Sequence, residues 1–546
     1  MRRFVSVMAC VLLLVFALTA FAACVNSRED MDELVVYNWA DYIYDYEQDF
    51  KDYYEEVTGR KIKVTYVTFD TNETMLTRLT QGDSNVDVVC PSEYAIQKLI
   101  ESNMLLPLNY FDEAEYTKSF AGAVSGYEHN AGNVEQGIID KVSDAFGALT
   151  ITKTGETVSM VDYFVPYMYG TLGILYNKYA FMEMGIYDAD VMNKANWGIF
   201  FNDDGEGNVL SDDLTGYILM KDSIRDSYAA TVFYMLESGR LDGLMNEDGK
   251  LYTELSAGDL INAVDDQLLE IVREVLIEQK SQLFGYEVDF GKDDLLQGNA
   301  IVDLAWSGDA LYAVEESWDD TLGENGDYEL AYYVPHSAGN IWFDGWVVPK
   351  TYNPDHLTAI KLFINFLNTP HAAAENFMEI GYTPAIKPDV LQNSAEARAV
   401  FSEGYLVYDP EFWDVVDDKG NPLSQDDCDY ASWEDFCEYF FDYVDEIDGS
   451  NWRYPFVSAE MNADNNRNLQ TLGVMRDFGA NNKAVVTAWN YARSAGTTAL
   501  PLLGWTALAV GVAVGALYLF VLIKRMLSHT VKLGKADEEE KTAPEA

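Results

Sequence analysis

Aromatic residues stand beside polar or acidic residues in several short segments of the sequence. The segments read NWADY at residues 38–42, PSEY at 91–94, WSGD at 306–309 and IWFDGW at 341–346. An aromatic face attracts a cation electrostatically, and a carboxylate both attracts it and accepts its hydrogen bonds. Segments of this composition therefore suit the binding of an organic cation, although a single tryptophan or tyrosine in a loop more often serves packing.

The first two segments follow predicted strands of an α/β sheet. Hydrophobic periodicity predicts strands at 34–37, 62–67 and 86–89, a helix at 45–57 that ends at Gly59, and a second helix that starts near Thr71 and Asn72. Strands that alternate with helices form parallel sheets, and ligands of such sheets bind at the loops after the strand C-termini. Residues 38–42 and 91–94 are therefore expected at one edge of the sheet.

The remaining segments repeat this arrangement. A predicted strand at 301–305 leads into Trp306, and residues 341–346 are expected to form a loop before a strand at 347–348. An amphipathic helix is predicted at 357–367, followed by a turn at 381–384. The body between the two chain ends is longer than a single core normally supports, so two lobes are expected.

The composition narrows the classes of partner and chemistry. A formal net charge of -54 disfavours nucleic acid, whose phosphates require clustered lysine and arginine, and it suits a cationic ligand, although most of this acidity is expected on a solvated surface. The five histidines are scattered, and the sequence has no HExxH, paired CxxC, GxSxG or P-loop motif. No metal, cofactor or catalytic residue is therefore predicted. Cys428 and Cys437 could pair outside the cytoplasm, which their spacing leaves open.

Both ends of the chain predict attachment to a membrane. Residues 1–23 have the basic start, apolar run and small residues of a lipoprotein-type signal peptide, so Cys24 would carry the lipid and 24–32 would be a linker. A plain signal peptide or an uncleaved anchor is the alternative. Residues 499–523 predict a transmembrane helix, and Lys524 and Arg525 place the tail at 524–546 in the cytoplasm. The bulk of the chain is expected outside the cytoplasm, at the cell membrane.

A series of motifs resembles one known family. In chain order they read YNWADYI (37–43), TNETM (71–75), DVVCPSEY (87–94), PYMYGTLGILYN (166–177), AWSGDA (305–310), IWFDG (341–345), INFLNTP (364–370) and IGYTP (380–384). Together they resemble the spermidine/putrescine-binding proteins of bacterial ABC transporters. The resemblance implies an α/β, two-lobed periplasmic-binding-protein fold of type II with a hinge between the lobes. Lobe 1 would comprise 33–170 and 340–384, and lobe 2 would comprise 171–339 and 385–495.

The resemblance also implies the ligand-binding residues. The positions that match the family's aromatic box are Trp39, Tyr42, Tyr94, Trp306, Trp342 and Tyr382. Ser92 offers a hydroxyl. Asp344 matches a carboxylate that holds an amine near the middle of the ligand.

The terminal carboxylates depart from the family's pattern. Asp226 matches one of two acidic anchors for a terminal amine, but Ser223 stands where the family has the second. Asp222 or Asp309 could compensate. Asp41 and Glu93 lie in the same loops as the aromatic residues, and as lone carboxylates they are expected to be solvated or capping groups.

These observations predict a binding protein, not an enzyme, that captures spermidine or putrescine in an aromatic and acidic cleft between the lobes. Its partners would be the polyamine, the permease subunits of an ABC transporter, and the membrane. A protein of the same fold for another organic cation or small solute is the first alternative, favoured by Ser223. An extracytoplasmic hydrolase is the alternative of another class, because paired carboxylates can act as acid and base. A membrane-anchored sensor is disfavoured by the short cytoplasmic tail.

Overall fold

The computed structural model describes residues 31–82, 85–120, 122–186, 196–317, 329–416, 419–442, 453 and 472–495. The predicted signal peptide, Cys24, the predicted span at 499–523 and the tail at 524–546 lie outside these residues. Within them, no helix is long and apolar enough to cross a bilayer. Contacts divide the chain into two compact units, residues 1–486 and residues 487–546, and both sheets that position the candidate site belong to the first.

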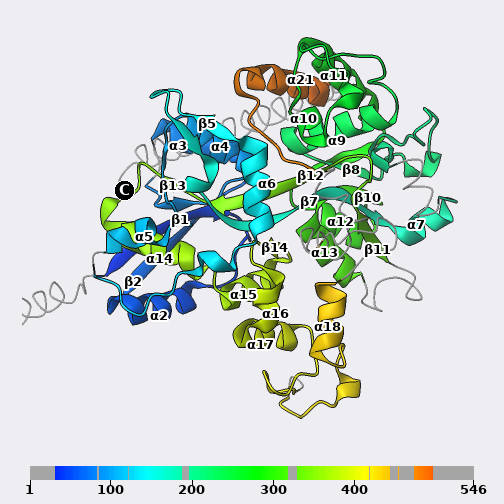
Figure 1. Cartoon of the computed structure of the whole chain (residues 1–546). Helices are drawn as coiled ribbons and strands as arrows, with labels where there is room; N and C mark the ends of the chain where they lie inside the picture. The colour runs from blue at the N-terminus through cyan, green and yellow to red at the C-terminus, as the bar shows by residue number, and fades with distance from the viewer. Residues whose placement is uncertain are drawn as a thin grey trace, which may run out of the picture. The chain divides into compact units, whose positions relative to one another are not determined.

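Strands and helices alternate through most of the described chain, and Figure 1 labels them in order. The strands are β1 (Asp32–Trp39), β2 (Ile62–Phe69), β3 (Val88–Val89), β4 (Leu105–Leu106), β5 (Ala148–Thr150), β6 (Thr157–Ser159), β7 (Val165–Asn177), β8 (Ile218–Lys221), β9 (Leu283–Glu287), β10 (Val302–Trp306), β11 (Leu330–Tyr333), β12 (Gly339–Trp346), β13 (Val348–Pro349), β14 (Thr383–Pro384) and β15 (Leu472–Gly473). The α-helices are α2 (Glu47–Thr58), α3 (Asn72–Gln81), α4 (Glu93–Glu101), α5 (Glu113–Tyr116), α6 (Gln136–Phe146), α7 (Lys178–Glu183), α9 (Ile224–Glu237), α10 (Ala257–Asn262), α11 (Asp266–Gln279), α12 (Gly291–Leu296), α13 (Ser307–Glu316), α14 (Leu357–Phe366), α15 (Pro370–Ile380), α16 (Pro388–Asn393), α17 (Ala395–Gly404), α18 (Trp433–Phe440) and α21 (Asn482–Ser494).

The first sheet has the parallel order β2-β1-β3, as the alternation of strands and helices predicts. Successive side chains of a strand point to opposite faces. Val36 and Val88 therefore pack with Phe50 on the side of α2 and α14, whereas Tyr37 and Val89 belong to the core on the side of α3 and α4. Figure 1 shows these two helix pairs on opposite sides of the sheet. Both faces are covered at the central strand β1, which explains its apolar run from Leu34 to Tyr37, whereas the edge strand β2 alternates.

Local sequence signals set the ends of the helices on this sheet. The Thr71 side chain accepts a hydrogen bond from the backbone N–H of Thr74, 3.1 Å away, and so caps the start of α3. Gly59 ends α2 with a φ of 69°, a left-handed conformation that costs glycine little. The predicted helix start at Thr71 and helix end at Gly59 are confirmed.

The second sheet is built on one long strand. β7 is buried along its whole length and pairs antiparallel with β10, β11, β12 and β14. The sheet continues from β10 to the parallel strands β8 and β9. Figure 1 shows β12 and β7 extending from the region of the first sheet toward β10 and β8. Bridges from Val89 to Val347 and from Ser92 to Asp344 join the two sheets beside the predicted site residues.

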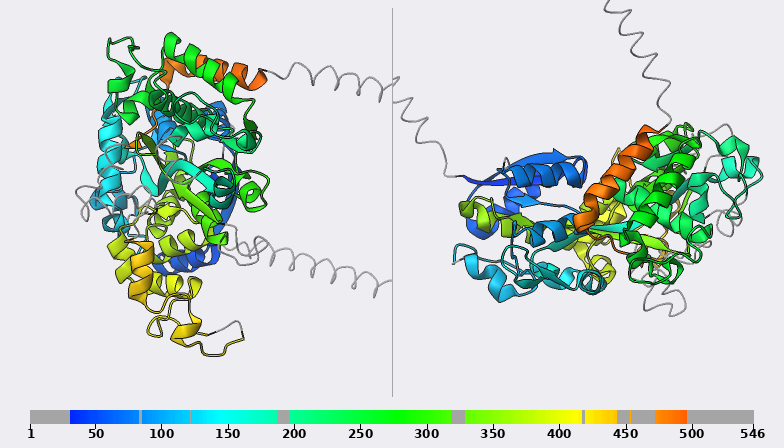
Figure 2. Two further views of the ribbon diagram at one scale, coloured as in Figure 1. Left: turned by 90° about the vertical axis from the view of Figure 1, so that its right-hand side faces the viewer. Right: turned by 90° about the horizontal axis from the view of Figure 1, so that it is seen from above.

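The segment after β14 adds a helical group that the sequence motifs do not cover. Helices α16, α17 and α18 gather with α15, as the left view of Figure 2 shows. Phe377 of α15 packs against Phe401 and Phe440, with ring centroids 6.0 and 4.6 Å away. The hydroxyls of Tyr405 and Tyr439 donate to the Glu315 carboxylate of α13 at 3.4 and 3.2 Å. The added helices are therefore fastened to the second sheet through α13.

The prediction of a loop at 341–346 is wrong, because these residues form most of β12. Their backbone groups are paired with β7 from Asn340 to Trp346. A strand that is buried on both faces lacks the apolar and polar alternation that marks a half-exposed strand. Two shorter stretches expected as loops also turn out to be helical starts, since α4 begins at Glu93 and α13 begins at Ser307.

An alanine at position 345 is predicted to destabilise the chain. Its Cβ would lie 2.7 Å from the backbone carbonyl oxygen of Val165 and would also overlap the Phe164 ring. We expect Gly345→Ala to lower the free energy of unfolding by about 1–3 kcal/mol, measured by denaturant titration. Gly285→Ala in β9 is the matched control, because nothing lies within 4 Å of that Cβ. Equal losses from the two substitutions would contradict this account.

Candidate ligand-binding site

Asp344 places a buried carboxylate where the two sheets meet. β12 carries it at the point where the ladder with β7 shifts register, between Asp344 and Gly345. The residue is 6% exposed, and its Oδ1 atom has no hydrogen-bond partner. Among the ion pairs of the described residues, none includes Asp344. This carboxylate is therefore available to a cation from outside the chain.

The surroundings of Asp344 oppose its ionisation. Burial raises the pKa of Asp344 to about 7, while the side chains of Ser92 and Tyr42 lower it and the charge of Asp226 raises it further. An ammonium group beside the carboxylate would favour its ionised form by direct charge attraction. The Asp344 carboxyl is thus more often protonated when the site is empty than when the site holds a cation.

Aromatic rings lie near this carboxylate, whose charge, after the larger effect of burial, raises the pKa of Tyr42 and of Tyr382. The Tyr382 ring lies 5.2 Å from the Tyr42 ring and 5.6 Å from the Trp342 ring, measured between centroids, in edge-to-face arrangements. Trp39 lies at the end of β1, with its ring 4.5 Å from that of Phe69. The indole nitrogens of Trp39 and Trp342 and the hydroxyl of Tyr42 have no hydrogen-bond partner in the described part of the chain. The group offers both ring faces and unused donors to a ligand.

Two glycines leave room for these rings. A Cβ on Gly170 would lie 2.6 Å from the Trp342 ring, and a Cβ on Gly308 would overlap the Tyr382 ring. Neither glycine is needed for a left-handed backbone, since neither has a positive φ. Their role is to let backbone and ring approach closely.

Ser92 and Tyr94 are held together by Asn72, which the sequence analysis identified only as a helix cap. The Asn72 side-chain amide donates to the Ser92 hydroxyl and to the Tyr94 hydroxyl, each at 3.0 Å. Its carbonyl oxygen accepts from the backbone N–H of Ser92 at 3.2 Å. Ser92 and Tyr94 stand at the start of α4, and Asn72 at the start of α3. The two helix starts thus form one hydrogen-bonded edge of the site.

Asp226 and Trp306 come from the second sheet and its helices. Asp226 lies in the first turn of α9, where its backbone N–H donates to the capping Ser223 hydroxyl at 3.4 Å. Burial raises the pKa of Asp226, and the side chains of Ser223, Lys221, Trp306 and Arg225 lower it. Because Asp226 also influences Asp344, the structure brings the two predicted carboxylates into one electrostatic environment.

Arg225 contributes a positive charge that the sequence analysis did not assign to the site. Its guanidinium lies 3.8 Å above the Phe478 ring and 5.8 Å from the Tyr94 ring, and it donates to Asn262 at 2.7 Å. Burial lowers the pKa of Arg225, while the neighbouring Tyr94, Tyr228, Glu93 and Asp226 raise it. The sequence does carry a signal for this role of Arg225, because Arg225 directly precedes the predicted site residue Asp226 at the start of a helix.

The expectation that Glu93 is a solvated or capping group is wrong. Glu93 is 0% exposed, and its carboxylate accepts a hydrogen bond from the backbone N–H of Phe343 at 2.9 Å. Burial raises the pKa of Glu93 to about 8, the hydrogen bond from Phe343 lowers it, and Asp344 raises it. The residue ties α4 to β12 directly beside Asp344.

Asp309 and Asp222, the two residues that could compensate for Ser223, differ in their burial and in their partners. Asp309 is 8% exposed, and its carboxylate accepts from the Lys292 ammonium at 2.8 Å. It raises the pKa of Tyr382, after the larger effect of burial. Asp222 is half-buried at the end of β8, where its backbone N–H donates to Glu287 at 2.6 Å. Asp309 therefore borders the aromatic group, but a lysine of the chain already pairs with it.

In the described ranges, no group of three or more histidine, cysteine, aspartate or glutamate residues is arranged to hold a metal ion. Cys90 is buried, and Cys428 and Cys437 are free thiols in the structure. The chemistry available to the site from the described residues is ionic, aromatic and hydrogen-bonding.

Replacing Asp344 by asparagine is predicted to stabilise the ligand-free protein by an amount that depends on pH. The raised pKa means that the folded state keeps a proton that the unfolded state releases near the ordinary value of 3.8. Wild-type stability is therefore lost as pH rises from about 4 to about 7, by at most ~1.4 kcal/mol per pH unit. Denaturant titrations should show the advantage of Asp344→Asn growing over this interval and levelling above it.

The control for this prediction is Asp204→Asn. Asp204 is on the surface, and hydrogen bonds from Asn208 and Glu206 lower its pKa. Its substitution should not reproduce the growing advantage. A difference between Asp344→Asn and wild type that is constant from pH 4 to pH 8 would contradict the burial of an ionisable Asp344.

Comparison with known proteins identifies the family. A family model described as bacterial extracellular solute-binding protein matches residues 49–399. The putrescine-binding periplasmic protein SpuD of Pseudomonas aeruginosa is 24% identical over 367 residues, which cover 66% of this chain and 81% of that protein. The spermidine/putrescine-binding periplasmic protein of Escherichia coli is 21% identical over 355 residues, covering 65% and 78%.

Solved structures support the same fold. The TpPotD lipoprotein of Treponema pallidum superposes with a TM-score of 0.50 at 16% identity, covering 84% of this chain and 99% of that one. The predicted α/β periplasmic-binding-protein fold and the resemblance to spermidine/putrescine-binding proteins are thereby confirmed.

The family match spans more than half of the chain and covers β7, β10 and β12, the strands that carry or support Trp306 and Asp344. The matched relatives are binding proteins, so the chain is a binding protein and not an enzyme. It belongs to the family of bacterial extracellular solute-binding proteins.

Proposed function

We propose that the chain captures a polyamine of the spermidine or putrescine class. The observation that carries this proposal is Asp344, a buried carboxylate with an unpartnered oxygen beside the rings of Tyr42, Trp342 and Tyr382. A polyamine combines ammonium groups with methylene chains, so it needs both a carboxylate and aromatic faces. The names of the matched relatives from Pseudomonas aeruginosa and Escherichia coli agree with this ligand class.

In this proposal the ligand binds between two lobes that close upon it. The first sheet and β12 supply Trp39, Tyr42, Ser92, Tyr94, Trp342 and Asp344, Tyr382 stands just before β14, and the region of β8, β10 and α9 supplies Asp226 and Trp306. The lobe boundaries are those predicted from the sequence, with β7 and β12 crossing between them. Closure excludes water, which strengthens the attraction between ammonium and carboxylate.

We propose that the bound polyamine is delivered to the permease of an ABC transporter at the cell membrane. The bulk of the chain would lie outside the cytoplasm, held by lipid on Cys24 and by the helix at 499–523, with residues 524–546 inside. The family description and the periplasmic location named for the relatives support an extracytoplasmic body.

A second candidate ligand is another organic cation or small solute. Ser223 caps α9 where the resemblance implies an acidic anchor. Lys221, Arg225 and Lys292 also bring positive charge close to Asp226 and Asp309. These features favour a ligand with a different distribution of charge.

Isothermal titration calorimetry of the full chain in mild detergent tests the proposal. Spermidine and putrescine should show saturable one-to-one binding. Asp344→Asn should weaken binding by at least about tenfold, because the ammonium loses its carboxylate, and Trp306→Ala should weaken it by about five- to tenfold. Asp204→Asn on the surface and Trp433→Ala in α18 are the matched controls. The absence of binding by any polyamine to a folded, ligand-free sample would refute the ligand class.

Affinity is also predicted to fall in acid. Asp344 must be ionised to hold an ammonium, and its pKa in the empty site is about 7. Lowering the pH from 8 to 5 should therefore weaken binding progressively, approaching about tenfold per pH unit below the pKa. Titrations of wild type and Asp344→Asn at several pH values separate this effect from others. An affinity of the wild type that does not change between pH 5 and pH 8 would show that Asp344 does not hold the ligand.

A further inference from the structure

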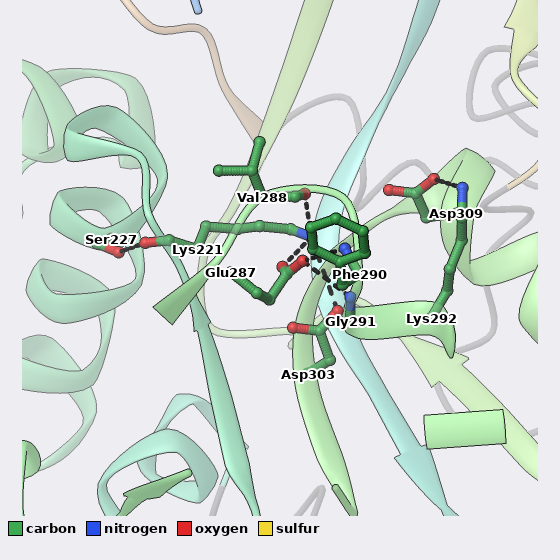
Figure 3. A network of polar contacts seen from close by, with 9 residues as sticks. All are labelled: Lys221, Ser227, Glu287, Val288, Phe290, Gly291, Lys292, Asp303 and Asp309. Carbon is green, nitrogen blue, oxygen red and sulfur yellow. Dashed lines mark hydrogen bonds and ion pairs between the residues drawn. The ribbon is translucent and has the colours of Figure 1, made fainter. Parts of the chain in front are cut away.

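A buried lysine lies over one of the predicted ligand-binding rings, that of Trp306. Lys221 ends β8 and is 1% exposed at its side chain. Its ammonium pairs with Glu287, donates to the carbonyl oxygen of Val288 at 3.2 Å, and lies 3.7 Å from the Asp303 carboxylate. Figure 3 shows Lys221 reaching into this group of acidic residues. The lysine is therefore held in one place by contacts that do not involve a ligand.

The same ammonium engages the Trp306 ring. The Nζ atom of Lys221 lies 4.5 Å from the ring centroid, which is within the range of a cation–π interaction. Burial lowers the pKa of Lys221, but the charges of Asp303, Glu287 and Asp309 raise it by more, so the lysine stays protonated. Trp306 already interacts with one positive charge that belongs to the chain.

The carboxylates at this end of the site are also compensated. Asp309 pairs with Lys292 at 2.8 Å, as Figure 3 shows. Asp226 lies among the positive charges of Lys221 and Arg225, which both lower its pKa. Asp303 is completely enclosed, and burial raises its pKa. Asp289 is exposed at this end, and its pKa is raised by desolvation and by the charge of Asp309.

Asp344 stands in contrast, because no cation of the described residues pairs with it. We propose that Lys221 and Lys292 occupy the place of a ligand ammonium at the Trp306 end of the site, so that the chain prefers an amine whose Trp306 end is uncharged. The ligand then carries one ammonium fewer than a triamine and is held at Asp344. This inference rests on the proposed function, because it concerns the charge of the amine bound there.

The physical reason is that an aromatic ring and a carboxylate each stabilise a second cation less than a first. A ligand ammonium near Trp306 would be repelled by Lys221 through a medium of low dielectric constant. It would also have to displace Lys292 or Arg225 from the carboxylates that they accompany. A methylene or methyl group at the same place makes the same contact with the ring and meets no repulsion.

Two ligands that differ only in one ammonium test the proposal. Spermidine has a terminal ammonium at the end of its propyl arm, and N-butyl-1,4-diaminobutane has a methyl group in place of that ammonium. Calorimetry with the full chain should show the analogue binding about tenfold more tightly than spermidine. Tighter binding of spermidine to the wild type would overturn the inference and leave the proposed function standing. Binding of neither amine would refute the proposed function, and the inference with it.

Paired substitutions identify the lysine as the cause. Lys221→Met with Glu287→Gln removes the charge of both partners, which avoids leaving the Glu287 carboxylate buried and unpaired. This variant should shift the preference toward spermidine by about tenfold, whereas Lys153→Met at an exposed position should not change it. A folded double variant with the wild-type preference would overturn the inference.

A second variant covers the case in which the double variant does not fold. Lys292 is partly exposed, with 31% of its side chain accessible, so Lys292→Gln should be tolerated. It frees the Asp309 carboxylate beside Tyr382 and should raise the affinity for spermidine more than that for the analogue. Equal changes for the two ligands, or none, would contradict the role of the internal ammonium groups.

Discussion

The burial of Asp344 without a cation is the constraint on which the rest of the site depends. A charged carboxylate loses much of its hydration inside a protein, and the chain compensates for that loss only in part, through Ser92 and Tyr42. In the empty site, the Asp344 carboxyl therefore keeps its proton up to about pH 7. In the proposed function, a bound ammonium supplies the missing charge, so ligand binding and the ionisation of Asp344 would be coupled. Recognition of a cation would follow from this coupling together with the neighbouring rings.

The scaffold keeps this carboxylate in position by joining two sheets at one strand. β12 is paired with β7 along its length and is bridged to the first sheet at Val347 and Asp344. Glu93 of α4 accepts from the backbone N–H of Phe343, one residue before Asp344. Gly170 and Gly308 allow the backbone to approach the rings of Trp342 and Tyr382. A change in any of these contacts would move Asp344 or the neighbouring rings without removing a group that is proposed to bind the ligand.

Positive charge is distributed unevenly around the site. Lys221, Arg225 and Lys292 lie near Trp306, Asp226 and Asp309, while the described residues bring no ion pair to Asp344. Ser223 stands where the resemblance implies an acidic anchor, and in the structure its hydroxyl caps α9 through the backbone N–H of Asp226.

The strands and helices of the first sheet could be predicted because their signals are local. The cap at Thr71, the end of α2 at Gly59 and the alternation of strand and helix depend on neighbouring residues. The strand at 341–346 could not be recognised, since burial on both faces removes the alternating pattern that identifies a strand. Glu93 was misjudged for a related reason: its partner, the backbone N–H of Phe343, is 250 positions away in the chain.

The sequence by itself determined the fold class, the family resemblance and the residue types from which a cation site can be built, because these depend on composition, periodicity and order along the chain. Only the tertiary structure decided which carboxylates are compensated and which is open. Lys221 meets Trp306 from a different strand, and Lys292 meets Asp309 from a different helix. Charge compensation falls steeply with distance in space and bears no fixed relation to distance in sequence, so it becomes visible only when the chain is folded.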